Sequence, residues 1–220
     1  MMTYEEIKKD KEILTYIQQA DECLGALGYT EHSLAHVTHC AKTAGDLLTA
    51  LGYDERTVQL AQIAGHLHDI GNMVNRQDHA HSGAMLAFYL LRERGADPAD
   101  VAEVVTAIGN HDEGTAQPVS PQSAALILAD KSDVRRSRVR RDRKHAFDIH
   151  DRVNYAVTAS NLSLSDDKKN LTLSLTLDTK ITDVMSYFEI FLSRMSLCKK
   201  AAKYLGLRFQ LEINGQKLVQ

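Results

Sequence analysis

The sequence has few cysteines and no long apolar run. Its three cysteines, Cys23, Cys40 and Cys198, are widely separated and show no C-x-x-C spacing. This pattern excludes a disulfide framework and a zinc knuckle, and it favours a reducing compartment in which the thiols fill the core. No stretch approaches the roughly 18 consecutive apolar residues that a membrane span needs, and the charged N-terminal segment lacks a signal-peptide core. We therefore expect a soluble, cytoplasmic protein without a membrane partner.

An excess of charge of one sign is also lacking, because the formal net charge is only -3. This near balance gives the chain no general attraction for nucleic acid or anionic lipid. The length of 220 residues is enough for one sizeable core or for a core with a small appended unit. Ten histidines are a high count for such a chain, and metal or proton chemistry is one reason to retain that many.

The first part of the chain shows the 3.6-residue apolar period of helices and no strand pattern. Thr3 and Glu6 have the spacing of a capping box, and Gly52 follows an apolar stripe as a helix stop. Pro98 and Pro121 each follow a capping residue, as at the first position of a helix. The expected helices cover about 31–51, 55–70 and 79–94, and two more begin at the prolines. Residues 1–150 are therefore predicted to form a helical bundle.

After about residue 151 the apolar period changes from 3.6 to 2, which is typical of strands. The predicted strands contain Val153, Tyr155 and Val157, then the leucines 171, 173, 175 and 177, and finally Phe209, Leu211 and Ile213. Residues 166–170 are expected to form a hairpin loop, and 182–205 an amphipathic helix. The predicted fold is mainly α, with a small C-terminal α+β unit at 151–220 that has antiparallel strands and one helix. Two features of this unit are candidate interfaces for a homodimer: an exposed strand edge and the helix stripe Phe188, Phe191, Met195.

Histidine and aspartate residues stand at the ends of the predicted helices in an order that suggests metal binding. His36 lies on the apolar stripe of its helix, whereas His39 lies on a polar face. His68 likewise continues an apolar stripe, and His66 is expected to point to solvent. A carboxylate buried after an apolar run is costly unless it is paired or ligating. The candidate metal ligands are His36, His68, Asp69, His79, His111 and Asp130.

Two assignments stay open on the residues alone. Either His79 or His81 could point inward from the first turn of the same helix. Any acid or base role would fall to a group behind the ligands, such as His32, His81 or Lys131.

Three motifs include candidate ligands: A-G-H-L-H-D-I-G, which contains the doublet His68-Asp69, H-V-T-H-C-A-K-T-A, which begins at His36, and L-I-L-A-D, which ends at Asp130. They resemble the HD-domain superfamily of metal-dependent phosphohydrolases, an all-helical fold, over roughly residues 28–140. The resemblance implies that His36, His68, Asp69 and Asp130 hold one metal. It also implies that His79 and His111 bind a second ion bridged by Asp69, and it favours His79 over His81.

The chain departs from several branches of that superfamily. Asn72 replaces the lysine that often follows the doublet. Asn110-His111 replaces the His-His pair of the HD-GYP phosphodiesterases, and the E-D pair of the (p)ppGpp hydrolases is not visible. The ligand order is most similar to that of bacterial diadenosine tetraphosphate hydrolases, which generally lack a C-terminal sheet.

The expected chemistry is hydrolysis by a metal-activated hydroxide, since a bound metal can lower the pKa of water from 15.7 to about 7. Two divalent ions are expected. The mixed His and carboxylate set favours Fe or Mn, while Mg, Ni, Co and Zn stay open. The substrate is predicted to be a phosphate ester or phosphoanhydride of a nucleotide or related small molecule. Asp69 and His68 are the predicted catalytic core.

A basic run covers residues 130–145, next to the last predicted ligand. One interpretation is a rim for substrate phosphates, with Lys131, Arg135, Arg136 and Arg138 as contacts. A solvated helix end is the second, and a nucleic-acid patch is the third, although the run lacks the aromatic residues that single-strand binding uses. Two alternatives to an enzyme follow: a catalytically silent nucleotide sensor and an RNA-associated protein.

Overall fold

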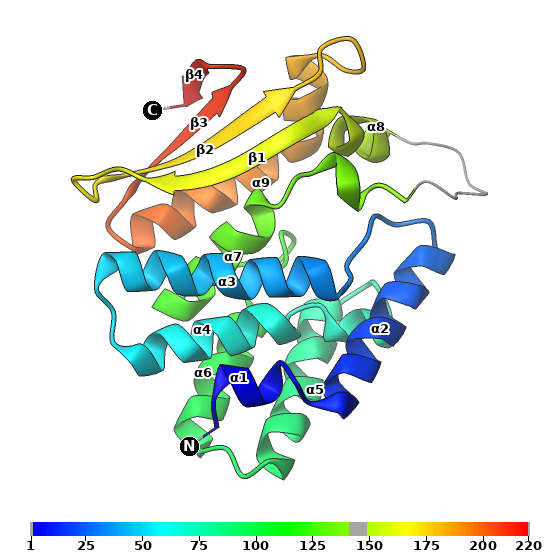
Figure 1. Ribbon diagram of the computed structural model, residues 1–220, viewed down its shortest axis with the longest axis vertical. Helices are drawn as coiled ribbons and strands as arrows, with labels where there is room; N and C mark the ends of the chain where they lie inside the picture. The colour runs from blue at the N-terminus through cyan, green and yellow to red at the C-terminus, as the bar shows by residue number, and fades with distance from the viewer. Residues whose placement is uncertain (1, 141–148, 220) are drawn as a thin grey trace.

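The computed structural model describes residues 2–140 and 149–219, and it divides into a helical layer and a sheet-bearing layer (Figure 1). Residues 141–145 of the basic run therefore lie outside the described residues. The helical elements are α1 (Tyr4–Ile7), α2 (Lys11–Ala26), α3 (Leu34–Leu51), α4 (Glu55–Leu67), η1 (Ile70–Met73), α5 (His79–Glu93), α6 (Pro98–Gly109), α7 (Pro121–Ser132) and η2 (Arg136–Arg138).

Local capping sets the limits of these helices. The Thr3–Glu6 capping box is present, and Ser33 caps α3 by accepting the N–H of Ala35. Gly52 ends α3 with a φ of 87°, a left-handed conformation in which glycine carries no steric penalty. The prolines at 98 and 121 are each the first residue of a helix, as predicted.

The helices that carry the site pack very closely. Small side chains fill the space where α3, α4 and α7 meet, namely Cys40, Ala44, Ala61, Ala125 and Ala129 together with Leu48. At the crossing of α3 and α4, a Cβ added to Gly65 would lie 2.8 Å from the backbone of Ala41. Only glycine lets the two helices approach this far, so residue 65 determines how near the end of α4 comes to the start of α3.

The C-terminal unit contains α8 (Ile149–Ala156), β1 (Val157–Leu164), β2 (Asn170–Leu177), α9 (Val184–Tyr204), β3 (Arg208–Ile213) and β4 (Gln216–Val219). The strands form one sheet in the order β1-β2-β3-β4, and the β1–β2 hairpin has the register Leu164↔Leu171. The outer pairs are antiparallel, but β2 and β3 are parallel. The prediction of an antiparallel sheet was therefore wrong for this pair, because α9 crosses over between the two strands.

A second correction concerns Val153 and Tyr155, which belong to helix α8 and not to a strand. Val153 and Ala156 are both buried and have the spacing i and i+3 of one helix face, whereas Val157 is the first residue of β1. The alternation of Val153, Tyr155 and Val157 hid this spacing, because Ala156 was not counted as a core residue.

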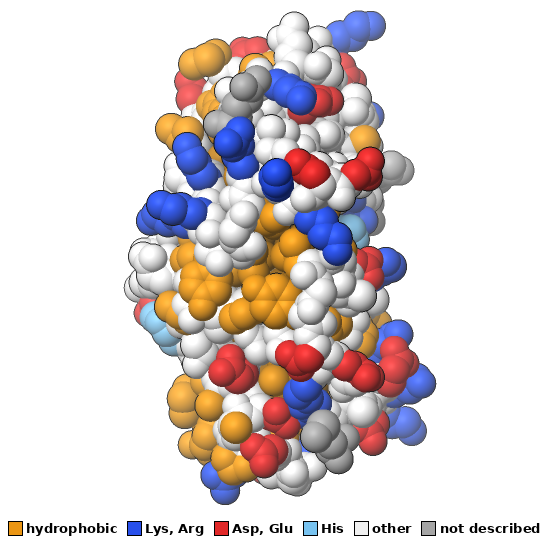
Figure 2. Space-filling view, turned by 90° about the vertical axis from the view of Figure 1, so that its left-hand side faces the viewer, with side chains coloured by type: hydrophobic (Ala, Val, Ile, Leu, Met, Phe, Trp, Pro, Cys, Tyr) orange, Lys and Arg blue, Asp and Glu red, His pale blue; other side chains and the backbone are white. Residues whose placement is uncertain are grey.

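Helix α9 lies between the sheet and α7 and joins the two layers (Figure 1). One core unites Ile127 and Leu128 of α7 with Tyr187 and Phe191 of α9 and with Leu173 of the sheet. On one narrow side of the molecule, basic side chains gather over the upper, sheet-bearing half, above an apolar area near mid-height (Figure 2). Among the described residues, every helix is too short or too polar to cross a membrane.

Candidate metal centre

The six predicted ligands converge in the helical layer from five different elements. His36 is in the first turn of α3, His68 follows the last residue of α4, and Asp130 lies in α7. His79 begins α5, and His111 follows the end of α6. All six are buried, with exposed fractions between 0 and 9% for His36, His68, Asp69, His79, His111 and Asp130.

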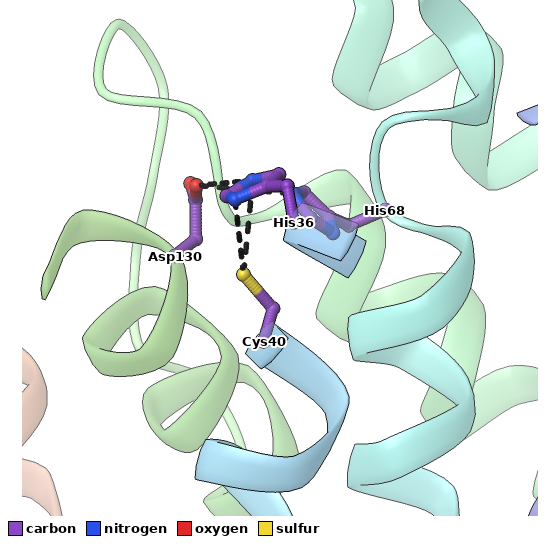
Figure 3. Close-up of side chains that lie close together, drawn as sticks. All are labelled: His36, Cys40, His68 and Asp130. Carbon is purple, nitrogen blue, oxygen red and sulfur yellow. Dashed lines mark hydrogen bonds and ion pairs between the residues drawn. The ribbon is translucent and has the colours of Figure 1, made fainter. Parts of the chain in front are cut away.

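The ligand atoms lie close enough to share an ion. His36 Nε2 is 3.3 Å from Asp130 Oδ1 and 3.5 Å from Asp69 Oδ2. His68 Nε2 is 3.1 Å from Asp69 Oδ2 and 3.8 Å from Asp130 Oδ1. Ligand atoms of His36, His68 and Asp130 lie within 4.8 Å of one another, and so do those of His68, Asp69 and His111. His36, His68 and Asp130 face one another from three different elements in Figure 3.

The Nδ1 atoms of the histidines are held by hydrogen bonds outside this centre. His68 Nδ1 donates to the Gly65 carbonyl at 2.9 Å, and His79 Nδ1 to the Arg76 carbonyl at 3.1 Å. His111 Nδ1 donates to the Ile108 carbonyl at 2.6 Å. These bonds assign the proton to Nδ1 and leave the Nε2 lone pair for a metal. Burial also holds the pKa of His111 well below 6.5, so this ring is neutral and able to ligate.

Asp133 completes the anchoring of His36, and the sequence analysis missed it. His36 Nδ1 donates to Asp133 Oδ2 at 2.7 Å, and the Asp133 side chain is fully buried. Burial raises the pKa of Asp133, but the bond from His36 and the charge of Arg138 outweigh burial and lower it. The signal in the sequence was its position three residues after Asp130, directly after the end of α7.

Two buried atoms lack the partner that a metal would supply. His68 Nε2 and Asp69 Oδ2 lie 3.1 Å apart, but with the His68 proton on Nδ1 both atoms are acceptors, and neither has a hydrogen-bond donor among the described residues. Asp69 Oδ1 does have one, since Asn72 Nδ2 donates to it at 2.9 Å. A buried polar atom without a partner destabilises the fold by about 1–3 kcal/mol. A divalent cation would satisfy both atoms, so this set of donors fits a metal.

Cys40 lies against His36, with Sγ 3.7 Å from both ring nitrogens (Figure 3). Equal distances show that the sulfur does not lie along the lone pair of either nitrogen. Burial, and then the nearby Asp130 carboxylate, raise the pKa of Cys40 well above 9. A protonated thiol is a poor ligand, so Cys40 packs beside the centre as part of the core.

The structure shows which of the other histidines lie near the centre and which do not. His79 is buried, with Nε2 3.6 Å from Asp69 Oδ1, whereas the His81 side chain is 59% exposed. His32 lines the cavity in front of the centre. The expectation that His66 points to solvent was wrong, because α1 covers it and Tyr4 packs edge-on against its ring at 5.8 Å.

A cavity of about 310 Å³ opens in front of the ligands, and it is lined by both layers of the molecule. Lys131 and Arg138 line it, whereas Arg135 and Arg136 do not. Arg135 pairs with Asp133, and Arg136 donates to the Tyr155 carbonyl at 2.6 Å. Two further cations of the lining, Arg76 and Arg194, were not predicted.

A larger groove of about 430 Å³ lies between α3 and β1. Its one imidazole is the exposed His39, and none of the six predicted metal ligands lines it. The groove therefore lacks the converging donors that distinguish the smaller cavity.

Comparison with known proteins agrees with this geometry. Residues 29–137 match the HD domain family, and this range contains all six predicted ligands. This part of the chain belongs to the HD superfamily. The chain is also similar to an uncharacterized protein of Methanocaldococcus jannaschii, with 25% identity over 214 residues that cover 86% of this chain and 80% of that protein. A further match is the crystal structure of a predicted HD superfamily hydrolase from an uncultured Thermotogales bacterium, with 31% identity, a TM-score of 0.45, and coverage of 56% of this chain and 67% of that chain.

The likeness to the Methanocaldococcus protein is longer than the HD domain itself. Because it covers 86% of this chain, it includes residues outside 29–137. The site nevertheless depends on both parts, since Arg194 and Phe191 of the C-terminal unit line the cavity of the HD domain.

Proposed function

We propose that this protein is a metal-dependent phosphohydrolase that cleaves a phosphate ester or phosphoanhydride of a nucleotide or related small molecule. The observation that carries the proposal is the pair of buried atoms without partners, His68 Nε2 and Asp69 Oδ2, among further histidines whose Nδ1 protons are already engaged. Membership of the HD superfamily supports it. Fe or Mn is the favoured metal, because the donors are a mixture of imidazole and carboxylate.

A bound divalent metal supplies a nucleophile from water at neutral pH and neutralises phosphate oxygens. The residues of the chain hold and orient the participants. His36, His68, Asp69 and Asp130 would hold one ion, and His79 and His111 would hold a second together with Asp69. Asn72 fixes the rotation of the Asp69 carboxylate, and Asp133 fixes the ring of His36.

Lys131 is placed to act on the substrate. Its Nζ is 2.7 Å from Asp130 Oδ2, and its side chain lies on the cavity wall. Burial lowers the pKa of Lys131, but the charges of Asp130 and Glu113 outweigh burial and raise it. The side chain therefore stays an ammonium group, which can bind a phosphate oxygen and stabilise negative charge on it.

The test is hydrolysis of a panel of phosphate esters and nucleotides by Asp69→Asn, which keeps the size of the side chain and removes its charge. The metal-loaded wild-type protein should release phosphate from at least one compound. Asp69→Asn should lose metal and at least about 100-fold in turnover, whereas the control Asp46→Asn, at an exposed position of α3, should keep both. Binding of a nucleotide without any product in the wild type would instead identify a sensor and overturn the proposal.

A further inference from the structure

Arg194 of α9 reaches the cavity of the HD domain from the C-terminal unit, and its orientation is fixed by two contacts. Its Nε donates to Glu113 Oε1 at 2.8 Å, and its guanidinium lies over the ring of Phe191 at 4.3 Å. The terminal nitrogens Nη1 and Nη2 make no hydrogen bond to any described residue. The side chain is only 22% exposed, so these two donors belong to the cavity wall and not to the outer surface.

Glu113 links this guanidinium to Lys131. The Lys131 ammonium is 3.8 Å from Glu113 Oε1, the same oxygen that accepts from Arg194. Lys131 is also 2.7 Å from Asp130 Oδ2. Glu113 therefore lies between the buried Lys131 and the half-buried Arg194. Lys131 is beside the candidate ligand Asp130, and Arg194 is further from it. Asp130 is itself a candidate metal ligand, so its negative charge is counted with the metal. The two positive charges of Lys131 and Arg194 are then balanced only by the single negative charge of Glu113, which leaves one positive charge.

We propose that Arg194 and Lys131 form a subsite for a second phosphate group, carried by a substrate whose reacting phosphate is at the metal centre. This inference rests on the proposed function and narrows it to compounds with two adjacent phosphate groups, such as nucleoside diphosphates and triphosphates. The free end of a guanidinium offers two parallel donors that match two phosphate oxygens. Lys131 contacts both the candidate ligand Asp130 and Glu113, which holds Arg194, so its ammonium would bind an oxygen that bridges the two phosphates.

The subsite gives the C-terminal unit a role in recognition. Arg194 lies outside residues 29–137, which match the HD domain. Helix α9 is held against α7 by a shared core that includes Ile127 and Phe191, so Arg194 is positioned relative to Asp130 by packing. A substrate with one phosphate would not reach this guanidinium, and its binding would not depend on it.

The experiment compares two ligands that cannot be hydrolysed, methylenediphosphonate and methylphosphonate, by calorimetry with the full-length, metal-loaded protein. The wild type should bind methylenediphosphonate at least about tenfold more tightly. Arg194→Gln should lose about tenfold or more for methylenediphosphonate and less than about twofold for methylphosphonate, since hydrogen bonds to a charged group contribute about 1.5–3 kcal/mol. Arg194→Lys, which keeps the charge without the paired donors, should fall between the two. Arg208→Gln, at an exposed position of β3, is the matched control.

Metal content and circular dichroism of each variant show that the site and the fold are intact. An equal loss for both ligands, or no loss in Arg194→Gln, would overturn the subsite. The two proposals fail separately. A protein that hydrolyses phosphate compounds without an Arg194-dependent preference would refute the subsite alone. A protein that shows this preference but hydrolyses none would refute the proposed function alone.

Discussion

Each histidine of the centre uses one ring nitrogen for the fold and keeps the other for chemistry. Three donate Nδ1 to a backbone carbonyl three residues earlier, which is a local contact. His36 instead donates to the Asp133 carboxylate, 97 residues away in the sequence. A carboxylate behind a ligand makes the imidazole more basic and fixes its tautomer, so Asp133 is expected to control the strength of the metal site.

Asp133→Asn should weaken metal binding by about 10- to 100-fold while the protein still folds, because the amide can accept the His36 proton but carries no charge. Competition with a chelator of known affinity measures the effect. Asp46→Asn, at an exposed ion pair with Lys42 on the same helix α3, is the control and should leave metal affinity unchanged. Equal affinities in the wild type and Asp133→Asn would show that this carboxylate does not act on the metal.

Asp10 ties the start of α2 to the end of α5, and it makes stability depend on pH. Its carboxylate accepts from Arg94 at 2.8 and 3.0 Å and caps α2. The hydrogen bond from Arg94 lowers the pKa of Asp10 below 3.8 in the folded protein. As the pH falls, the carboxylate of Asp10 is therefore protonated in the unfolded chain before it is protonated in the folded protein. Its contribution to the free energy of unfolding is complete above about pH 4 and is lost as the pH falls through the folded-state pKa.

Asp10→Asn should lower the free energy of unfolding by about 1 kcal/mol at pH 7, since asparagine still caps the helix but loses the ion pair. Urea denaturation at several pH values tests this. The difference between wild type and variant should shrink toward zero below about pH 4. A difference that stays constant across this range would mean that the charge of Asp10 has no part in it.

At the scale of elements, the close crossing of α3 and α4 brings His36 and His68 together. Gly65→Ala would place a methyl group 2.8 Å from the backbone of Ala41 and push the two helices apart. Overpacking of this kind costs about 1–3 kcal/mol, so both thermal stability and metal affinity should fall. Gly109→Ala is the matched control in α6, because its Cβ would meet only the Ala84 Cβ at 3.7 Å. If both variants melt like the wild type, the crossing tolerates a side chain.

The sequence allowed most helices of the first 140 residues, the hairpin loop, β2 and the convergence of the six candidate ligands to be predicted, because caps, periodicity and motif spacing are local signals; the position of β1 was predicted too early in the chain. It did not reveal α8, since three alternating apolar residues resemble a strand when Ala156 is disregarded. Arg194 was also missed, because its place in the cavity depends on how α9 packs on α7. Contacts of that kind join segments that are distant in the sequence, and they produce no periodic pattern of residues.

At the scale of the whole molecule, α7 is the shared element. Residues 122–132 of this helix are all buried, between the bundle on one side and α9 on the other. Asp130 and Lys131 are therefore held by both layers. A ligand that binds only the folded state stabilises every part that unfolds together with its site.

Removal of metal by a chelator should accordingly lower the melting temperature of the sheet and the bundle in a single transition, by several degrees. Near-ultraviolet circular dichroism, which reports on tyrosines of both layers, and far-ultraviolet circular dichroism, which is dominated by the helices, should give the same midpoint. Asp69→Asn should not respond to added metal. Two separate transitions would show that the layers are not coupled through α7.

The most direct test of the central claim is anomalous X-ray diffraction from crystals of the protein loaded with Mn²⁺. We predict a metal peak within about 2.0–2.3 Å of both His68 Nε2 and Asp69 Oδ2, the two buried atoms without a partner. A metal-loaded crystal with no anomalous peak there, and with water or a side chain bound to these two atoms, would contradict the account.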